Sequence, residues 1–488
     1  MDINGLTIKK FHDGLMNKEF SAFEAAENFF SDIEKKDEEI GAYLHLTKDL
    51  ALSQANKIDV DLARSLPAGR QGKDLGILAG LPIAIKDNIL IEGEQITAGS
   101  KILENHIASY DATVIKKLKQ AGAVFLGKTN LDEFAMGSST ENSAFKITHN
   151  PYDLERVPGG SSGGSAAAVS SDMAVAALGS DTGGSIRQPA GFCGVVGLKP
   201  TYGAVSRYGL IAMASSLDQI GPITKTVEDA EILFEAIRGK DMQDATSVNY
   251  ESGIRNYGLE DIRKLKIGLP KEYFIEGLDK QTSSAIDEAI KLLKSLKIEF
   301  KEISLAHTKY ALSCYYIIMP AEVSANLARF DGIRYSRISN PHSLISNLKD
   351  IYFNQRGRGF GAEVKRRIIL GNFVLSSGYY DAYYSKAQKV RRLIKTDFNK
   401  AFAGVDVILT PVSPTLPFKI GEKVDDPLAM YLSDIFTIPV NLAGLPGLTI
   451  PVKKYKIDRG ELPIGFQLIG KPFREADILG IGKYYEQL

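Results

Sequence analysis

The pattern of hydrophobic and polar residues divides the chain into a helical beginning and a longer part in which helices alternate with short apolar runs. Near the start, Ser21 and Glu24 have the three-residue spacing of a helix capping box. Apolar residues follow at helical intervals, at Phe23, Ala26, Phe30 and Ile33. We therefore predict a helical segment over about residues 1–65.

Beyond this segment the pattern changes to that of an α/β protein. The polar stretch from Ser65 to Asp74 contains Pro67 and is predicted to be a surface loop. Thr113 to Gln120 has the pattern of an amphipathic helix. Buried strands are predicted at Leu81 to Ile85, Ala123 to Leu126, Ala174 to Leu178, Lys266 to Leu269, Val405 to Leu409, Leu448 to Val452 and Ile464 to Ile469. Strands that alternate with helices favour an α/β fold with a parallel or mixed central sheet.

Glycine is concentrated between residues 158 and 203. Because glycine inside a regular element costs about 1 kcal/mol relative to alanine, such a block indicates backbone folded tightly around something small. Residues 271–400 are richer in helix-forming patterns and in tyrosine, and are predicted to be an insertion or a subdomain.

Composition narrows the function classes. The chain has 488 residues, of which 44% are hydrophobic and 24% charged, as in an ordinary globular protein. Lys plus Arg and Asp plus Glu both total 59, so the formal net charge is zero. A protein that gripped nucleic acid with its whole surface would show a basic excess, although a local basic patch stays possible.

Cysteine usage and the ends of the chain bear on its compartment. Cys193 and Cys314 are far apart, which suggests neither a disulfide framework nor a zinc site. The first residues lack the pattern of a signal peptide, and no window approaches the roughly 20 apolar residues of a membrane span. We predict a cytoplasmic protein without membrane association.

Two written motifs are misleading. Gly122 to Thr129 satisfies the P-loop pattern, but its Ala-Val-Phe-Leu interior reads as a buried strand rather than as a phosphate-binding loop. Gly159 to Gly163 fits the G-x-S-x-G nucleophile elbow. That elbow needs a later acid and histidine, and only His307 and His342 follow, in unsuggestive contexts. A histidine-dependent triad is therefore not expected.

A serine nucleophile without histidine needs another base, and Lys86 is the candidate. It ends the apolar run that begins at Gly80, where burial would lower its pKa from about 10.4 toward neutrality. Taken alone, a lysine at a strand end more often just extends into solvent. Two glycine–serine clusters follow, Gly159 to Ser165 and Asp181 to Arg187. Each alone reads as a flexible loop or a glycine-rich helix start, whereas both together with Lys86 argue against a chance arrangement.

These three segments resemble the amidase signature family over about residues 80–237. The resemblance implies a Ser–cis-Ser–Lys triad, in which Ser185 attacks the amide carbon, Ser161 relays the proton and Lys86 is the final base. It also implies a cis peptide bond before Ser161. Backbone N–H groups at Thr182, Gly183 and Gly184 would hold the oxyanion. The implied fold is a single domain over residues 1–488, with a large mixed sheet covered by helices on both faces and a signature core at about 75–240.

The C-terminal half is similar to the A subunits of aspartyl/glutamyl-tRNA amidotransferases. The stretches that carry this similarity are Tyr315 to Ile318, Arg329 to Tyr335, Gly359 to Arg367, Ser376 to Tyr384 and Asp425 to Tyr431. The resemblance implies that Arg367 binds the carboxylate of glutamine, Asp434 binds its ammonium group, and Tyr315 lines the pocket. Without the resemblance, Arg367 and Asp434 would read as ordinary surface charges. The departures are an extra loop at Leu66 to Gly72 and a short C-terminus.

The resemblance also implies partners. Glutamine would be the small-molecule substrate, and its ammonia would pass to a B subunit that activates misacylated tRNA with ATP and Mg²⁺, braced by a small C subunit. The chain itself would bind no cofactor and no metal, and tRNA would be held mainly by the B subunit. Two alternatives stay open at this point: a free-standing amidase for another small amide, and a non-catalytic scaffold of the same fold.

Overall fold

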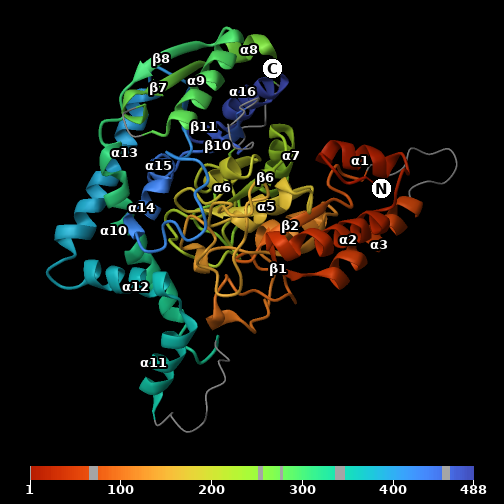
Figure 1. Ribbon diagram of the computed structural model, residues 1–488, viewed down its shortest axis with the longest axis horizontal. Helices are drawn as coiled ribbons and strands as arrows, with labels where there is room; N and C mark the ends of the chain where they lie inside the picture. Colours follow the sequence, from red (N-terminus) through yellow and green to blue (C-terminus); the bar gives the residue numbers. More distant parts are fainter. Residues whose placement is uncertain (1, 65–74, 251–256, 275–277, 336–346, 453–461) are drawn as a thin grey trace.

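An eleven-stranded mixed sheet runs through the molecule (Figure 1). The structure is a computed structural model that describes residues 2–64, 75–250, 257–274, 278–335, 347–452 and 462–488. The strands are β1 (Tyr43–Leu46), β2 (Pro82–Lys86), β3 (Val124–Thr129), β4 (Ala176–Asp181), β5 (Val196–Lys199), β6 (Gln219–Thr224), β7 (Lys266–Pro270), β8 (Glu299–Ile303), β9 (Val407–Pro411), β10 (Gly447–Pro451) and β11 (Gly465–Gly470). Their order in the sheet is β1-β3-β2-β4-β6-β5-β10-β11-β9-β7-β8.

The pairing is parallel at two places and antiparallel elsewhere. Strand β2 lies parallel to β3 and β4, and β7 lies parallel to β8 and β9. Strands β6, β5, β10 and β11 form an antiparallel centre that joins the two parallel parts. The prediction of an α/β fold with a mixed central sheet is confirmed.

Each predicted strand is present and begins within a residue or two of its predicted start, and Thr113–Gln120 is helical as predicted. The strands that the pattern missed are β1, β5, β6 and β8. Strand β6 contains Gly221 and Pro222, which are typical of loops, and β8 is an edge strand with exposed charged residues. Hydrophobic pattern alone does not mark either kind of strand.

Sixteen α-helices surround the sheet in the described part of the chain. They are α1 (Ile8–Met16), α2 (Ala22–Ile40), α3 (Lys48–Arg64), α4 (Thr113–Gln120), α5 (Gly163–Ser170), α6 (Arg187–Phe192), α7 (Val227–Ile237), α8 (Leu259–Arg263), α9 (Lys280–Ser295), α10 (Ala311–Asn326), α11 (Leu348–Gly359), α12 (Ala362–Leu375), α13 (Lys386–Ala401), α14 (Pro427–Tyr431), α15 (Ile438–Ala443) and α16 (Glu475–Gln487). Helix α2 starts with the predicted capping box of Ser21 and Glu24.

Helices cover both faces of the sheet, as strand β10 shows. Leu448 and Ile450 lie against Gly482 of α16, whereas Thr449 between them lies beside Gly191 of α6. Because neighbouring side chains on a strand point to opposite faces, α16 and α6 must lie on opposite sides. The sheet is therefore buried between two helical layers.

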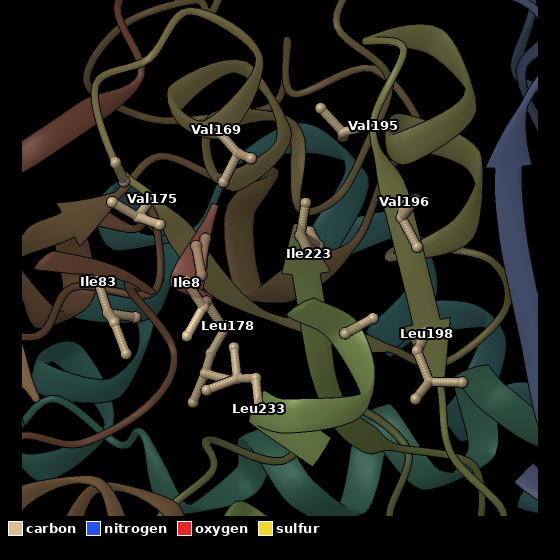
Figure 2. Close-up of a cluster of buried hydrophobic side chains, with 14 of the residues drawn as sticks. Ile8, Ile83, Val169, Val175, Leu178, Val195, Val196, Leu198, Ile223 and Leu233 are labelled. Carbon is tan, nitrogen blue, oxygen red and sulfur yellow. The ribbon is translucent and has the colours of Figure 1, made fainter. Parts of the chain in front are cut away.

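The central core is apolar on one side and made of very small residues where α5 enters. Figure 2 shows Ile83, Leu178, Ile223 and Leu198 from neighbouring strands together with Val169 of α5 and Leu233 of α7. Helix α5 is buried all round, and a Cβ atom on Gly164 would lie 2.5–2.6 Å from backbone atoms of Asn130 and Ala42. Part of the glycine block is therefore a buried helix that fits only because its residues are small.

The segment 271–400 joins the same sheet through β8 and adds the helices α9 to α13 (Figure 1). The single-domain organisation stays a prediction, and the predicted extra loop at Leu66 to Gly72 lies outside the described residues. No helix in the described ranges is long and apolar enough to cross a membrane.

Helices α10 and α12 pack unusually close at one point. A Cβ atom on Gly371 of α12 would overlap the carbonyl oxygen of Pro320 in α10. Helix propensity alone would make an alanine here favourable by about 1 kcal/mol. The overlap would force the two helices apart. The cost of this overpacking exceeds the gain in helix propensity, so the substitution should destabilise the protein.

We expect Gly371→Ala to lower stability by about 1–3 kcal/mol, the usual cost of overpacking, and to lower the melting temperature in calorimetry. Gly357→Ala in α11 is the matched control, because a Cβ atom there meets nothing within 4 Å. The control should leave the melting temperature unchanged or raise it. Equal, small effects of both substitutions would contradict the close approach of α10 and α12.

Candidate active site

Lys86 lies at the end of β2 and is completely buried. Its Nζ atom lies 2.8 Å from Ser161 Oγ, 2.8 Å from Ser162 Oγ, 3.0 Å from Ser180 Oγ and 3.2 Å from the Ser180 carbonyl oxygen. The predicted base and the predicted bridging serine are thus in direct contact. Lys86 points into the sheet's polar centre rather than into solvent, which removes the alternative of a lysine extending from a strand end.

The hydrogen bonds around Lys86 leave Ser161 as a possible donor to the amine. Ser162 Oγ donates to the Ser180 carbonyl (3.1 Å) and therefore accepts from Lys86. Ser180 also supplies that carbonyl as an acceptor to Lys86. A neutral amine has two N–H donors and one lone pair, so the four oxygen contacts exceed its donors. The lone pair can accept from the hydroxyl of Ser161 or from that of Ser180, whose Oγ lies 3.0 Å away.

Burial lowers the pKa of Lys86 to about 7, and the nearby carboxylates of Asp132, Asp181 and Asp218 oppose that shift. A lysine with this pKa is largely neutral just above neutral pH. It can therefore accept a proton, which an ordinary lysine cannot do at that pH.

The loop before Ser161 is held by contacts that exclude any side chain. The Gly160–Ser161 peptide bond is cis, as the resemblance implies. A Cβ atom on Gly160 would overlap a carboxylate oxygen of Asp132, and the Gly160 N–H donates to Gln188 Oε1 (2.9 Å). Asp132 itself accepts from the N–H of Thr140 (2.9 Å). The position of Ser161 thus depends on a buried carboxylate and an amide from two other segments.

Ser185 lies between β4 and α6, beside the Ser161–Ser162 loop. Its carbonyl oxygen accepts from the Ser162 N–H (3.1 Å), and the residue is 7% exposed. Within the described chain its hydroxyl makes no hydrogen bond. The structure therefore places the Ser185 backbone against the loop of Ser161 and Ser162, whose side chains contact Lys86.

Asp181 shapes the turn that carries Ser185. Its carboxylate accepts from the N–H groups of Gly184 (2.9 Å) and Ile186 (3.1 Å), from Arg187 (3.0 Å) and from Asn441 Nδ2 (2.9 Å). Burial alone would raise the pKa of Asp181, but Arg187 and the other donors lower it to about 2. The carboxylate stays ionised and keeps the turn closed across the physiological pH range.

The predicted oxyanion residues differ in what their backbone already binds. The Gly184 N–H donates to Asp181, whereas the N–H groups of Thr182, Gly183 and Ser185 have no acceptor within the described residues. Gly184 has a φ of 149°, and a Cβ atom at this position would overlap Thr437 Oγ1. Gly184 thus shapes the turn, while its neighbours offer the free donors that an oxyanion needs.

Tyr315 and Arg367 come from α10 and α12. A Cβ atom on Gly183 would lie 2.9 Å from the Tyr315 ring, so that ring closes over the serine turn. Arg367 is 4% exposed, donates to Glu363 Oε1 (2.8 Å) and lies over the rings of Tyr316 (5.4 Å) and Tyr431 (5.6 Å). The guanidinium is therefore a buried, oriented cation and not a surface charge.

Asp434 is a buried carboxylate with an unused oxygen. Its Oδ2 accepts from the Ser138 hydroxyl, while Oδ1 has no hydrogen-bond partner among the described residues and lies next to Gly184. Burial raises the pKa of Asp434 to about 7, and the Ser138 hydrogen bond and Arg367 counter this only in part. A buried unpaired carboxylate oxygen beside the serine turn is a ready acceptor for a cationic group.

The site residues that the motifs do not single out are mostly neighbours of those that they do. Ser162 and Asp181 lie inside the two serine clusters, but nothing in the sequence distinguishes their roles. Ser138 and Gln188 carry no sequence signal, because each acts through a contact with a distant segment. Glu363 could have been found from its i, i+4 spacing to Arg367 on one helix.

Two cavities adjoin these elements. Arg367 lines a cavity of about 50 Å³ together with Ser139 and Tyr431. A larger cavity of about 830 Å³ lies between α10, α11 and α12 and contains none of the predicted site residues. The P-loop alternative fails, because Lys128 is a completely buried residue of β3 that pairs with Asp87 (3.0 Å).

Comparison with known proteins finds one matching family model and several relatives that are similar over the whole chain. The family model described as Amidase matches residues 24–479. The A subunit of glutamyl-tRNA(Gln) amidotransferase from Carboxydothermus hydrogenoformans is 57% identical over 100% of this chain and 98% of its own length. The protein of the same name from Microcystis aeruginosa is 56% identical over 99% and 97%. The crystal structure of the corresponding glutamyl-tRNA(Gln) amidotransferase protein from Thermotoga maritima is 45% identical, with a TM-score of 0.79 over 100% of this chain and 95% of that one.

The lowered pKa of Lys86 predicts a pH-dependent nucleophile. We expect the rate at which a serine-directed acylating probe labels Ser185 to rise about tenfold per pH unit below pH 7 and to level off above it, since only neutral Lys86 accepts the proton. Mass spectrometry of the labelled peptide measures this rate.

Lys86→Arg should reduce labelling about a thousandfold at pH 8 and remove its dependence on pH, because a guanidinium stays protonated. Lys101→Arg, at an exposed lysine, is the control and should behave like the unchanged protein. Fast labelling of Lys86→Arg, or labelling of the unchanged protein that does not depend on pH, would exclude Lys86 as the base.

Proposed function

The chain belongs to the amidase family, and from this premise we propose that it is the glutamine-hydrolysing subunit of a tRNA-dependent amidotransferase. The observation that carries the proposal is the meeting of a Lys86–Ser161 pair and Ser185 with two buried, opposite charges, Arg367 and Asp434. The lysine and the two serines suit amide hydrolysis, and the pair of opposite charges suits an amino acid as substrate. The names of the relatives, which are amidotransferase subunits, agree with both inferences.

In the proposed reaction Ser185 Oγ forms a bond to the side-chain amide carbon of glutamine. The Ser185 proton passes to Ser161, whose own proton passes to neutral Lys86. The free N–H groups at Thr182, Gly183 and Ser185 stabilise the negative oxygen of the tetrahedral intermediate. The proton then returns to the amide nitrogen, the C–N bond breaks, and ammonia leaves an acyl-enzyme.

Water completes the cycle. It attacks the acyl carbon, and the Ser161–Lys86 pair takes its proton and returns it to Ser185 as glutamate leaves. The pair thus acts first as base, then as acid, and again as base and acid in the second half. A base with a pKa near 7 suits both directions of transfer.

Free glutamine carries one charge of each sign, and the proposed pocket offers the complement. Arg367 would bind the α-carboxylate, and the unpaired Oδ1 of Asp434 would bind the α-ammonium. Tyr315 would line the pocket between them. Arg367 and Asp434 form no ion pair with each other among the described residues. Arg367 pairs with Glu363 through Nε, so its terminal guanidinium nitrogens would have to bind the carboxylate, whereas Oδ1 of Asp434 is unpartnered.

The partners and cofactors belong to the same proposal. The chain would work in the cytoplasm with B and C subunits in a heterotrimer. Ammonia would reach a B subunit that uses ATP and Mg²⁺ on misacylated Glu-tRNA(Gln), with Asp-tRNA(Asn) left open as a second substrate. We propose no metal or nucleotide on this chain. The free-standing amidase alternative is less well supported, because relatives that match over nearly their whole length are named as amidotransferase subunits.

The first test is glutaminase activity of the chain co-expressed with its B and C subunits. We expect ammonia release from glutamine in the presence of ATP and misacylated tRNA, and a loss of about 10⁴-fold or more in Ser185→Ala, because the nucleophile is gone. Ser170→Ala, a serine outside the site, is the control. A well-folded assembly that releases no ammonia from glutamine would refute the proposal in favour of another amide.

The raised pKa of Asp434 gives a second test. Because only the ionised carboxylate attracts the ammonium group, KM for glutamine should fall as the pH rises through about 7 and stay low above it. Asp434→Asn should raise KM at least tenfold at pH 8 and abolish this dependence, while the pH dependence of kcat through Lys86 remains. A KM for glutamine that is unaffected by Asp434→Asn would remove Asp434 from the binding site.

A further inference from the structure

Glu133 is a buried carboxylate for which the reaction described above has no use. It begins the short 3-10 turn Glu133–Ala135 that follows β3, and it is 2% exposed. The next two residues, Phe134 and Ala135, have left-handed backbone conformations with φ values of 50° and 62°. Non-glycine residues adopt such conformations rarely, and usually where the surroundings impose them.

The Glu133 carboxylate ties the signature core to the turn between α11 and α12. Its Oε2 accepts from the Gly361 N–H (2.8 Å), and its Oε1 accepts from the Ser100 hydroxyl. Ser100 Oγ also lies 3.2 Å from the Gly359 carbonyl oxygen. Phe134 adds an edge contact to Phe360, with ring centroids 5.7 Å apart.

Gly361 is the N-cap of α12 and has no side chain with which to cap the helix. Helix N-termini leave N–H groups without partners, and an acceptor from elsewhere in the chain stabilises them. A Cβ atom on Gly361 would overlap Glu133 Oε2. Glu133 therefore satisfies the N–H of the N-cap residue, as the third helical residue does in a capping box, and glycine at 361 is what lets it approach.

Helix α12 carries Arg367 between two fixed points. At its start Glu133 holds Gly361, and further along Gly371 lies against Pro320 of α10. The residue before Glu133 faces the other half of the site, because the Asp132 carboxylate lies against Gly160 in the Ser161 loop. Two consecutive carboxylates thus reach the loop of the bridging serine and the helix of the substrate-binding arginine.

We propose that Glu133 is a positioning residue that sets α12, and with it Arg367, relative to the serines, and so determines preference for amides that carry an α-carboxylate. This inference rests on the proposed function of Arg367. Glu133 contacts neither Ser161 nor Ser185 and does not contact Arg367. Its effect must therefore appear in substrate binding rather than in acylation chemistry.

Glu133→Ala and Glu133→Gln in the co-expressed complex separate this role from general stabilisation. Burial raises the pKa of Glu133 to about 7, so the neutral carboxylic acid is already present near neutral pH and its carbonyl oxygen accepts from the Gly361 N–H. The side-chain amide of Glu133→Gln offers a similar neutral carbonyl oxygen. The Ser100 hydroxyl can then turn to donate to Gly359. We expect Glu133→Ala to raise KM for glutamine roughly 10- to 100-fold with kcat within about threefold, and Glu133→Gln to restore most of the affinity.

A double-mutant cycle with Arg367→Ala gives the sharper readout. Once Arg367 is gone, Glu133→Ala should change KM by less than about twofold, because both substitutions remove the same interaction with the carboxylate. Labelling of Ser185 by an acylating probe without a carboxylate should be unchanged in Glu133→Ala. Additive effects on KM, or equal losses in glutamine hydrolysis and probe labelling, would show a merely structural role and overturn the inference.

Hydrogen exchange distinguishes this failure from failure of the proposed function. In Glu133→Ala the first amides of α12 should exchange faster than in the unchanged complex, and in Glu133→Gln they should not. If the unchanged complex does not hydrolyse glutamine, the proposed function fails whatever the exchange shows. If it does, and α12 exchange or KM is unaffected by Glu133→Ala, the positioning role alone is refuted.

Discussion

The desolvation of one amine is the constraint on which the rest of the site depends. Lys86 is buried at a strand end and forms no direct ion pair with any residue that the structure describes. Burial brings its pKa to about 7 in spite of three carboxylates nearby. A direct carboxylate partner would hold the proton on the amine, and full solvation would do the same. Ser161, Ser162 and Ser180 instead supply neutral hydrogen-bond partners. Such a group can take and return a proton, which is what amide hydrolysis through an acyl-enzyme requires.

The serines surround the end of β2 only because the chain that carries them comes very close to neighbouring backbone and carboxylate groups. Residues with a Cβ atom could not come so close. The absence of a Cβ atom at Gly160 makes room for Asp132, and at Gly184 it makes room for Thr437 and Asp434. Gly164 allows α5 to enter between two other segments. The glycine block is therefore a condition of the geometry: glycine costs conformational entropy on folding, and Asp181 with Arg187 offsets part of that cost by closing the serine turn.

The charged residues proposed to bind the substrate come from a different part of the chain than the serines. Only the folding of the chain brings the two sets together. Helix α12 supplies Arg367, the segment after α14 supplies Asp434, and Tyr315 of α10 lies over Gly183. The Asp132–Glu133 dipeptide joins these two halves, since one carboxylate faces the serine loop and the other caps α12. In the proposed function, hydrolytic chemistry and substrate choice are thus built on separate elements that the Asp132–Glu133 dipeptide connects.

The sequence by itself determined the α/β class, the strands with strong apolar runs and the capped second helix, because each of these is encoded by neighbouring residues. The reaction class came from the resemblance of three separate motifs. Resemblance added Arg367, Asp434 and Tyr315, which no local pattern marks. Only the tertiary structure decided that Ser162 and Ser180 surround Lys86, that the Gly184 N–H is taken by Asp181, and that one oxygen of Asp434 stays unpaired. It also placed the glycine- and proline-containing strand β6 in the middle of the sheet. The physical reason is distance along the chain: Lys86 and Ser161 are 75 residues apart, and Ser138 and Asp434 are 296 apart. Burial, and with it every pKa and unpaired donor in the site, exists only once such segments have packed together.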